Sequence, residues 1–256
     1  MIEIKNLSFA YDNKIVLDDI STHIHQGDFY AITGPNGSGK TTLLKIIAGL
    51  IPTKDSVFIN QITIKNLKIR EIAKKIAYVP QNQDTTFNFS VFDTVMMGRN
   101  PYQSRWETFS EKDNHIVLDA LEKTNLLHLK DRFTNQLSGG EQQRVRIARS
   151  MAQDTPILLL DEPLSNLDIV NQFEIMDILS YLNKNKKRTI IIVLHNFSIA
   201  LQYVKQMIMI KEGKIIYSGN TQDVLTPKHI RELFDLSDHY LIDQQGNILK
   251  KTSDLF

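Results

Sequence analysis

Apolar and polar positions divide the chain into predicted strands and helices. The segments "MIEIKNLSFAY" and "SVFINQITI" partly alternate apolar and polar residues, a pattern typical of half-buried strands. The segments "FYAIT", "PILLLDEP" and "RTIIIVLH" contain continuous apolar runs, which favour parallel strands covered on both faces. The pattern therefore predicts a sheet-containing core that is built from both ends of the chain.

Helical spacing and cap residues appear between these strands. The segment "KTTLLKIIAGL" places leucines and isoleucines at helical spacing, and Gly49 and Pro52 supply stop signals. From about residue 85 to 150 the chain is predicted to be helical, because serines precede acidic residues by three at two helix starts, Ser90 with Asp93 and Ser110 with Asp113. After residue 220 the pattern predicts a short helix at "PKHIRELF" and a hairpin around Gln245–Gly246.

These elements predict an α/β core with an inserted helical region. We expect a single domain over residues 1–256, in which 1–84 and 151–220 form the core together with a β subdomain. Residues 85–150 form the helical subdomain, and 221–256 form a C-terminal extension.

Composition narrows the classes of protein. Lys plus Arg number 30 against 29 Asp plus Glu, so the net charge gives no strong electrostatic attraction for nucleic acid. The absence of cysteine excludes disulfides and thiolate metal sites and fits a reducing compartment. Apolar runs reach only about five residues, far below the ~18 needed for a membrane span, and the N-terminus lacks the pattern of a secretory signal.

The segment "GPNGSGKT" at 34–41 fits the phosphate-binding pattern G-x-x-x-x-G-K-[ST]. Its glycines allow backbone N–H groups to turn toward a polyphosphate, Lys40 can reach the β- and γ-phosphates, and the Thr41 hydroxyl can bind Mg²⁺. A predicted strand before it and a helix after it favour this interpretation over a chance match.

Three further polar positions follow predicted strands. Asp161 suits the Mg²⁺ shell and Glu162 suits water activation, although an acidic pair can also simply cap a turn. His195 ends an apolar strand and can contact a γ-phosphate, although a lone histidine is more often structural. Gln81, in "YVPQNQ", could reach the metal and the attacking water. Tyr11 can stack on a base or can pack on the surface of a strand end.

The segment "LSGGEQQRVRIARSM" starts a helix with two adjacent glycines. Ser138 and Glu141 form an S-x-x-E capping box, which would close the helix start without any ligand. In that alternative the three arginines at 144, 146 and 149 are ordinary solvated charges. Glycines are costly in a helix start, so Gly139 and Gly140 favour a place where a ligand approaches the backbone.

Taken together, the chain resembles ABC-type ATPases. The motifs "GPNGSGKT", "Q" at 81, "LSGGEQQ", "ILLLDEP", "SNLD" at 165–168 and "H" at 195 occur in that family's order and approximate spacing. The resemblance covers about residues 11 to 225. It implies a P-loop ATPase core with a parallel sheet, an N-terminal antiparallel β subdomain and an inserted helical subdomain.

The resemblance also implies roles for individual residues. Lys40 and the loop amides hold the phosphates of ATP; Thr41 and Gln81 bind Mg²⁺, with Asp161 in its shell. Glu162 is the catalytic base or positions water, Gln81 and His195 complete the catalytic group, and Asn166, Leu167 and Asp168 touch across a head-to-tail dimer. The expected nucleotide contacts are Tyr11, Gly34, Pro35, Asn36, Gly37, Ser38, Gly39, Lys40, Thr41 and Thr42, and, on the partner's nucleotide, Ser138, Gly139, Gly140 and Asp168.

A narrower resemblance points to ATPases of importers for siderophores, haem or cobalamin, through "SVFDTVMMGRNPYQSRWETFSEKD", "LDIVNQFEIMDIL" and "VLHNFSIALQY". Two departures stand out. Asn196 replaces the usual Asp after the histidine, which removes a charge that could matter for coupling between sites. Asp55 and Asn60 stand where glycines are common, and both residue types tolerate turns.

We therefore expect an ATPase that powers import of an iron complex at the cytoplasmic face of the cell membrane. Its expected partners are permease subunits, a second and identical ATPase subunit, and indirectly an extracytoplasmic binding protein; no nucleic acid is expected. The alternatives are an importer for zinc, manganese or another small solute, an exporter, and a soluble ABC protein acting on ribosomes or DNA.

Overall fold

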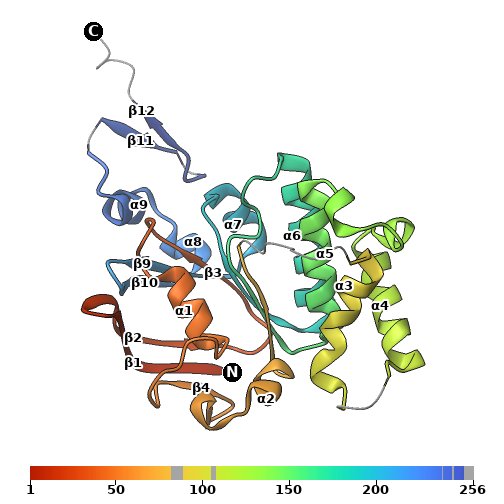
Figure 1. Cartoon of the computed structure of the whole chain (residues 1–256). Coiled ribbons are helices and arrows are strands. Elements are labelled where there is room, and N and C mark those ends of the chain that lie inside the picture. Colours follow the sequence, from red (N-terminus) through yellow and green to blue (C-terminus); the bar gives the residue numbers. More distant parts are fainter. Residues whose placement is uncertain (82–88, 105–107, 238, 244, 251–256) are drawn as a thin grey trace. The chain divides into compact units, whose positions relative to one another are not determined.

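The computed structural model describes residues 1–81, 89–104, 108–237, 239–243 and 245–250. Figure 1 shows the elements in chain order. The chain divides into two compact units, one made of Met1–Asn66 and Thr189–Phe256 and the other of Leu67–Arg188. These limits differ from the predicted domain boundaries, which remain predictions.

The first unit begins with an antiparallel sheet in the order β2-β1-β4-β5. Its long hairpin buries one face, and Leu7, Leu17 and Ile20 are fully inaccessible to solvent. The predicted alternation is therefore present in β1 and β4, whereas β5 has no buried residue and Ile62 is exposed. The strands are β1 (Ile2–Tyr11), β2 (Lys14–Ile24), β4 (Val57–Ile59) and β5 (Ile62–Thr63), followed by the 3-10 turn η1 (Ile64–Asn66).

The first unit also contains a second sheet around β3 (Phe29–Thr33). β3 pairs in parallel with β8 (Thr189–Val193) and with β9 (Gln206–Lys211), and β10 (Lys214–Asn220) adds an antiparallel edge. Every residue of β3 and β8 is buried, as continuous apolar strands require. The remaining elements are α1 (Lys40–Ile47), α7 (Phe197–Tyr203), α8 (Thr221–Val224), α9 (Pro227–Phe234), β11 (Tyr240–Ile242) and β12 (Ile248–Lys250).

The second unit combines a parallel strand pair with a helical region. β6 (Ile76–Val79) pairs with β7 (Ile157–Leu160), and β7 is fully buried. The helices α3 (Val91–Met96) and α4 (Glu111–Lys123) pack against α5 (Gly139–Ala152), as Figure 1 shows. The other elements are α2 (Ile69–Ala73), α6 (Ile169–Lys186) and the 3-10 turns η2 (Met97–Tyr102), η3 (Leu127–Leu129) and η4 (Thr134–Gln136).

The predicted helix starts of the helical region are confirmed. The Ser90 hydroxyl accepts from the N–H of Asp93, and the Ser110 hydroxyl accepts from the N–H of Asp113. The α/β class is likewise confirmed, with parallel strands, an N-terminal antiparallel sheet and a helical region. Within the described residues, no helix has both the length and the hydropathy of a membrane-crossing segment.

Candidate functional site

The loop between β3 and α1 has the backbone expected of a phosphate cradle. Gly34, Gly37 and Gly39 all have positive φ, at 153°, 78° and 102°. A Cβ on Gly34 would lie 2.0 Å from the carbonyl oxygen of Ile210, and one on Gly39 would lie 2.6 Å from Leu17 Cδ2. Two of these glycines are therefore demanded by packing inside this chain. Gly37 has no atom within 4 Å of such a Cβ, so its surroundings are open.

Helix α1 starts in an unusual way, because Gly39 is its N-cap residue in the left-handed conformation. Within the described part of the chain, no side chain caps this start. The first-turn N–H groups and the positive end of the helix dipole therefore favour an anion here.

Lys40 crosses the loop that precedes it. Its Nζ donates to the carbonyl oxygens of Gly34 at 2.9 Å and Pro35 at 2.8 Å. Beside it, the Ser38 hydroxyl is buried and has no hydrogen-bond partner among the described residues. A buried hydroxyl with an unmet hydrogen bond is costly, so it fits a ligand oxygen. The loop thus offers a cation, backbone N–H groups and a free hydroxyl to a polyphosphate.

His195 follows the strand next to this loop. β3 and β8 run parallel with Ile32 opposite Val193, so Gly34 and His195 both continue from the carboxyl ends of adjacent strands. The N–H of Leu194 donates to the carbonyl oxygen of Ile32, at 3.1 Å. His195 itself is exposed. The carboxyl edge of parallel strands is where ligands bind in α/β sheets, so the geometry favours a ligand-facing histidine.

Asn196 is the N-cap residue of α7, and its Oδ1 accepts from the N–H of Ile199 at 3.1 Å. Asn and Asp cap helices about equally well. This departure from the family pattern therefore retains the helix cap and removes only the negative charge.

The second unit carries the other predicted catalytic side chains. Asp161 and Glu162 follow β7, while Gln81 follows β6 by two residues, and the two strands are parallel neighbours. Gln81 Nε2 donates to Glu162 Oε2 at 2.6 Å, and the Ser165 hydroxyl donates to the same oxygen at 3.2 Å. Glu162 has a φ of 48°, a strained conformation for this residue type that is common at functional sites.

Asp161 is only 1% exposed, and its N–H donates to the carbonyl oxygen of Val79 at 2.9 Å. The hydroxyl of Tyr78 donates to Asp161 Oδ2 at 3.2 Å. Burial, followed by the nearby Asp161 carboxylate, raises the pKa of Tyr78, so this phenol stays a hydrogen-bond donor. Tyr78 was not predicted as a site residue. A strand position three residues before Gln81 carries no signal that identifies it.

The start of α5 forms the predicted capping box. The Ser138 N–H donates to Glu141 Oε2 at 2.7 Å, and the Glu141 N–H donates to the Ser138 hydroxyl at 3.3 Å. These bonds from Ser138 lower the pKa of the Glu141 carboxyl. The box therefore satisfies two backbone N–H groups of this helix start, those of Ser138 and Glu141.

The two glycines at this start have different surroundings. A Cβ on Gly139 would have no atom within 4 Å, whereas one on Gly140 would lie 2.4 Å from Asn171 Oδ1. Packing inside the chain thus explains Gly140, and only Gly139 leaves open space for a ligand. The prediction that both glycines serve ligand approach needs this refinement.

Asn171 joins the starts of two helices. Its side-chain Nδ2 donates to Asp168 Oδ2 at 2.7 Å, and Asp168 is the N-cap residue of α6. Arg144 Nη1, on α5, donates to Asn171 Oδ1 at 2.8 Å and lies 2.6 Å from Glu174 Oε2. Hydrogen bonds from Asn171 lower the pKa of Asp168. Asn171 was not predicted, since only its spacing of three from Asp168 hints at a contact.

The arginines of α5 are not ordinary solvated charges, so that alternative is wrong. The Arg144 side chain is largely covered, and burial lowers the pKa of both Arg146 and Arg149. In contrast, Val145, Ala148 and Ala152 on the same helix are buried.

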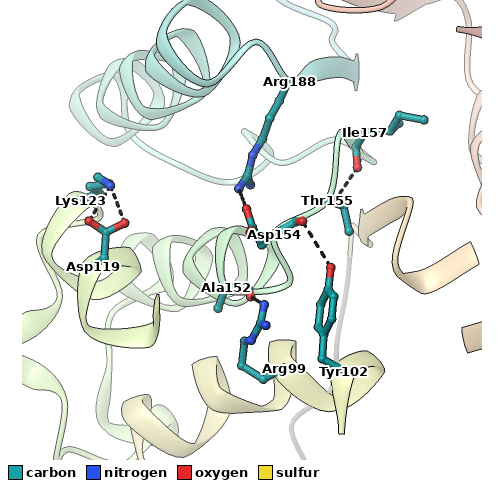
Figure 2. A network of polar contacts seen from close by, with 9 residues as sticks. All are labelled: Arg99, Tyr102, Asp119, Lys123, Ala152, Asp154, Thr155, Ile157 and Arg188. Carbon is teal, nitrogen blue, oxygen red and sulfur yellow. Dashed lines mark hydrogen bonds and ion pairs between the residues drawn. The ribbon is translucent and has the colours of Figure 1, made fainter. Parts of the chain in front are cut away.

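The far end of α5 is fixed by a polar network, shown in Figure 2. Arg99 Nη1 donates to the carbonyl oxygen of Ala152 at 2.7 Å, and Arg188 Nη2 lies 2.7 Å from Asp154 Oδ1. Arg99 is buried and also pairs with Asp113 at 2.8 Å. Burial would raise the pKa of Asp113, but the hydrogen bonds from Ser110 and Arg99 outweigh it and hold the value at about 2. Both ends of α5 are thus held firmly.

Tyr11 ends β1, and its ring meets the edge of Phe9 with centroids 4.9 Å apart. The residue is 48% exposed, which leaves ring surface available for stacking on a base. The contact also fits the alternative of packing on a strand end, so both interpretations remain open.

The donor set suits magnesium more than a transition metal. Among the described residues, no group of three His, Cys, Asp or Glu side chains could hold a metal. Thr41, Gln81 and Asp161 instead offer a hydroxyl, an amide and a carboxylate oxygen, the ligand types that Mg²⁺ uses together with phosphate oxygens. Each of these donor types therefore fits Mg²⁺.

Comparisons with known proteins agree with a nucleotide-binding role for these side chains. Residues 17–165 match the family model described as ABC transporter. The chain is 34% identical to an iron(3+)-hydroxamate import ATP-binding protein of Bacillus subtilis, over 95% of this chain and 91% of that protein.

Two solved structures are also similar. One is an inward-facing ABC transporter assigned to the metal-chelate type, with a TM-score of 0.83 and 26% identity over 100% of this chain and 98% of that chain. The other is a dimeric ATP-binding cassette in a post-hydrolysis state with ADP and Pi, with a TM-score of 0.74 and 31% identity over 86% and 99% of the two chains.

Proposed function

The chain belongs to the ABC transporter family and is an ATP-hydrolysing subunit of an importer, and from this premise we propose that it powers uptake of an iron complex. The observation that carries the proposal is the 34% identity, across 95% of the chain, to the import ATPase for iron(3+)-hydroxamate. The likeness to a transporter assigned to the metal-chelate type supports the same cargo class.

In the proposed reaction the loop of the first unit holds the polyphosphate of ATP. Lys40 exchanges its bonds to the carbonyl oxygens of Gly34 and Pro35 for bonds to the β- and γ-phosphates. The Ser38 hydroxyl gains its missing partner. The other contacts of the loop come from Asn36, Gly37, Gly39, Thr41 and Thr42, while Tyr11 stacks on the adenine.

Glu162 acts on the water that attacks the γ-phosphate. The hydrogen bonds from Gln81 and Ser165 to Oε2 fix the orientation of its carboxylate. The Tyr78 hydroxyl orients the Asp161 carboxylate in the same way, and the bond from the Asp161 N–H to the carbonyl oxygen of Val79 fixes its backbone. Thr41, Gln81 and Asp161 would hold Mg²⁺, which would supply positive charge to neutralise the phosphates. His195 donates a hydrogen bond to the γ-phosphate.

A second copy of the chain, packed head to tail, completes each site. Ser138, Gly139 and Gly140 face the partner's γ-phosphate from the start of α5, where the open space beside Gly139 admits it. Asn166, Leu167 and Asp168 lie at the contact between the two copies. Asn166 has a φ of 61°, so the backbone turns sharply there. ATP binding closes the dimer, and hydrolysis reopens it.

The importer places this subunit at the cytoplasmic face of the membrane. Separate permease subunits dock on the surface around Gln81 and the helical region, and an extracytoplasmic binding protein delivers the cargo to the permease. ABC cassettes pair with transmembrane subunits in transporter complexes, as in the similar metal-chelate type transporter.

Uptake by cells tests the cargo. In the source organism, the gene would be deleted and the uptake of radioactive iron measured with iron supplied as a hydroxamate, a catecholate or haem. We expect the deletion strain to lose uptake of one of these iron complexes. The wild-type gene should restore that uptake, and the gene carrying Glu162→Gln should not. The Glu162→Gln chain should still bind ATP, so this control separates the chemical step from assembly.

Zinc and manganese uptake measured in the same strains distinguishes the second cargo class. Loss of either metal's uptake with unchanged iron uptake would show that the iron assignment is wrong and leave the ATPase assignment intact. Near wild-type turnover in Glu162→Gln would instead remove the proposed role of this carboxylate.

A further inference from the structure

The C-terminal hairpin has a buried tip and exposed strands. Leu241 on β11 and Leu249 on β12 face each other across the hairpin, and they are 51% and 54% exposed. Gly246, in the turn between the strands, is buried. An isolated two-stranded hairpin is marginally stable in water. The contacts of its tip therefore help to hold this hairpin on the first unit, together with the hydrogen bond from Arg231 Nη2 to the carbonyl oxygen of Tyr240 at 3.0 Å.

The tip packs on the first turn of α7. A Cβ on Gly246 would lie 2.8 Å from Phe197 Cβ and 3.3 Å from Ile230 Cδ1. Gly246 also has a φ of 82°, a conformation that suits glycine. The Ser198 hydroxyl adds long hydrogen bonds to Asn247 Oδ1 at 3.4 Å and to the carbonyl oxygen of Gln245 at 3.5 Å. The backbone of the turn thus lies directly against α7.

The turn is stiffened by its own side chains. The Asp243 carboxylate accepts from the N–H groups of Gln245 and Asn247 and from Asn247 Nδ2, each at 2.8 Å. The bonds from Asn247 lower the pKa of Asp243. Because these bonds fix the shape of the turn, it can act as a rigid wedge against its neighbour.

Helix α7 depends on such support. It has only 7 residues, too few for a helix to be stable without tertiary packing. Phe197 is 7% exposed, and its ring lies 6.1 Å from that of Phe234 at the end of α9. The helix begins directly after Asn196, so His195 lies between the end of β8 and this first turn. The packing of Phe197 therefore limits the orientations open to His195.

We propose that the turn carrying Asp243, Gly246 and Asn247 braces α7 and thereby positions His195 for ATP hydrolysis. Gly246 and Phe197 are positioning residues, because they reach the reaction only through His195. This inference rests on the proposed role of His195 at the γ-phosphate. Loss of the brace leaves the phosphate loop intact, so it lowers the rate of hydrolysis without weakening nucleotide binding.

The test compares Gly246→Val with Leu249→Ser in the full-length chain. Gly246→Val pushes against Phe197, whereas Leu249→Ser changes an exposed side chain of the same hairpin. We expect Gly246→Val to lower kcat about 10-fold, the order of loss that a misplaced catalytic group gives. KM for ATP should change less than about twofold, and amide hydrogen exchange at Ile199 and Ala200 should speed up. A folded Gly246→Val chain with the kcat of Leu249→Ser would overturn the proposal.

A double-mutant cycle with His195→Ala shows whether the brace acts through the histidine. We expect His195→Ala combined with Gly246→Val to turn over at the rate of His195→Ala alone. An additional loss as large as that of Gly246→Val alone would overturn the positioning role. Unchanged turnover in His195→Ala would remove the histidine's proposed function itself, whereas faster exchange in α7 with unchanged kcat would remove only the brace.

Gly246→Val is the stronger of two possible changes. If that chain does not fold, Asn247→Ala carries the same test, because it removes the bond to Asp243 and the long bond from the Ser198 hydroxyl without placing a new atom against Phe197. It should show the same split between kcat and KM at smaller size. Equal kcat in Asn247→Ala and Leu249→Ser would then count against the brace.

Discussion

Two helix starts in this chain have the composition of anion sites, and they are built in opposite ways. At α1 no side chain from the described residues caps the helix, Gly39 takes a left-handed conformation, and Lys40 crosses the loop. At α5 the Ser138–Glu141 box satisfies two backbone N–H groups of the helix start from within the chain. The first start has no side-chain cap among the described residues, whereas the second has a capping box that satisfies two of its backbone N–H groups.

The difference explains how one cassette can hold half of two sites. A start without a side-chain cap leaves its first-turn N–H groups to face the nucleotide, as the phosphate loop is proposed to do. A start with a capping box already has two of its N–H groups satisfied, so it gains fewer hydrogen bonds from the nucleotide and suits a surface that docks and separates in each cycle. Substitutions at the two helix starts should therefore impair nucleotide binding and turnover in different ways.

The largest effect is expected at the start of α1. Lys40→Ala removes the cation proposed to bind the β- and γ-phosphates, and turnover should fall about 100- to 1000-fold with loss of nucleotide affinity. Lys45→Ala, which removes the same charge in the last turn of the same helix, is the matched control. Steady-state hydrolysis and a fluorescent nucleotide titration measure both. Equal affinities in the two variants would contradict the importance of this start.

At the start of α5 the loss should spare binding. Ser138→Arg places a bulky side chain where the partner's nucleotide is proposed to lie, so turnover should fall about 100-fold with normal nucleotide affinity. Mixing this variant with Lys40→Ala should partly restore hydrolysis, since a mixed dimer contains one intact composite site. Ser138→Ala, which loses the cap without added bulk, is the control. No recovery on mixing would indicate that each chain works alone.

The two glycines of α5 sharpen the comparison further. Gly140→Ala forces a methyl group against Asn171 and should lower the free energy of unfolding by about 1–3 kcal/mol. Gly139→Ala enters open space, so stability should change by less than about 1 kcal/mol while turnover falls. Urea unfolding and ATPase rates give the two readouts. Equal stability of both variants would show that Asn171 moves aside easily.

Acid should affect the two starts unequally and only slightly. Glu141 has a lowered pKa in the folded chain, so its stabilising effect is present above its unfolded pKa of about 4.3 and disappears as the pH falls through its folded pKa. The unfolding free energies of wild type and Glu141→Gln should differ by up to about 1 kcal/mol at pH 7 and converge toward pH 3. No first-turn acid contributes at α1. A difference that does not depend on pH would contradict the charged form of this cap.

The sequence predicted what local patterns determine. Apolar runs located β3, β7 and β8, and the residues that follow them include Lys40, Asp161 and His195 because these strands end at one kind of edge. Serine and acidic residues three apart located the starts of α3, α4 and α5. These features depend on neighbours within a few residues, so the amino-acid sequence alone is enough to find them.

Contacts between distant segments could not be predicted. The hydrogen bond from Tyr78 to Asp161 and the packing of Asn171 on Gly140 join residues far apart in the chain. Neither Tyr78 nor Asn171 has a local pattern that predicts its contact. Solvent exposure of the α5 arginines was an alternative, because a helical pattern does not reveal which arginines are covered by other residues. The cassette architecture itself was expected from the family resemblance rather than from any single motif.

Asn171 has one more consequence, and it concerns evolution. Its side chain fills the space that Gly140 leaves, holds the N-cap residue of α6 and accepts a bond from Arg144. A substitution at position 171 must therefore be compatible with the starts of both α5 and α6. In an alignment of related cassettes, a larger residue at 140 should appear only together with a smaller one at 171, and the two positions should behave as one inherited unit.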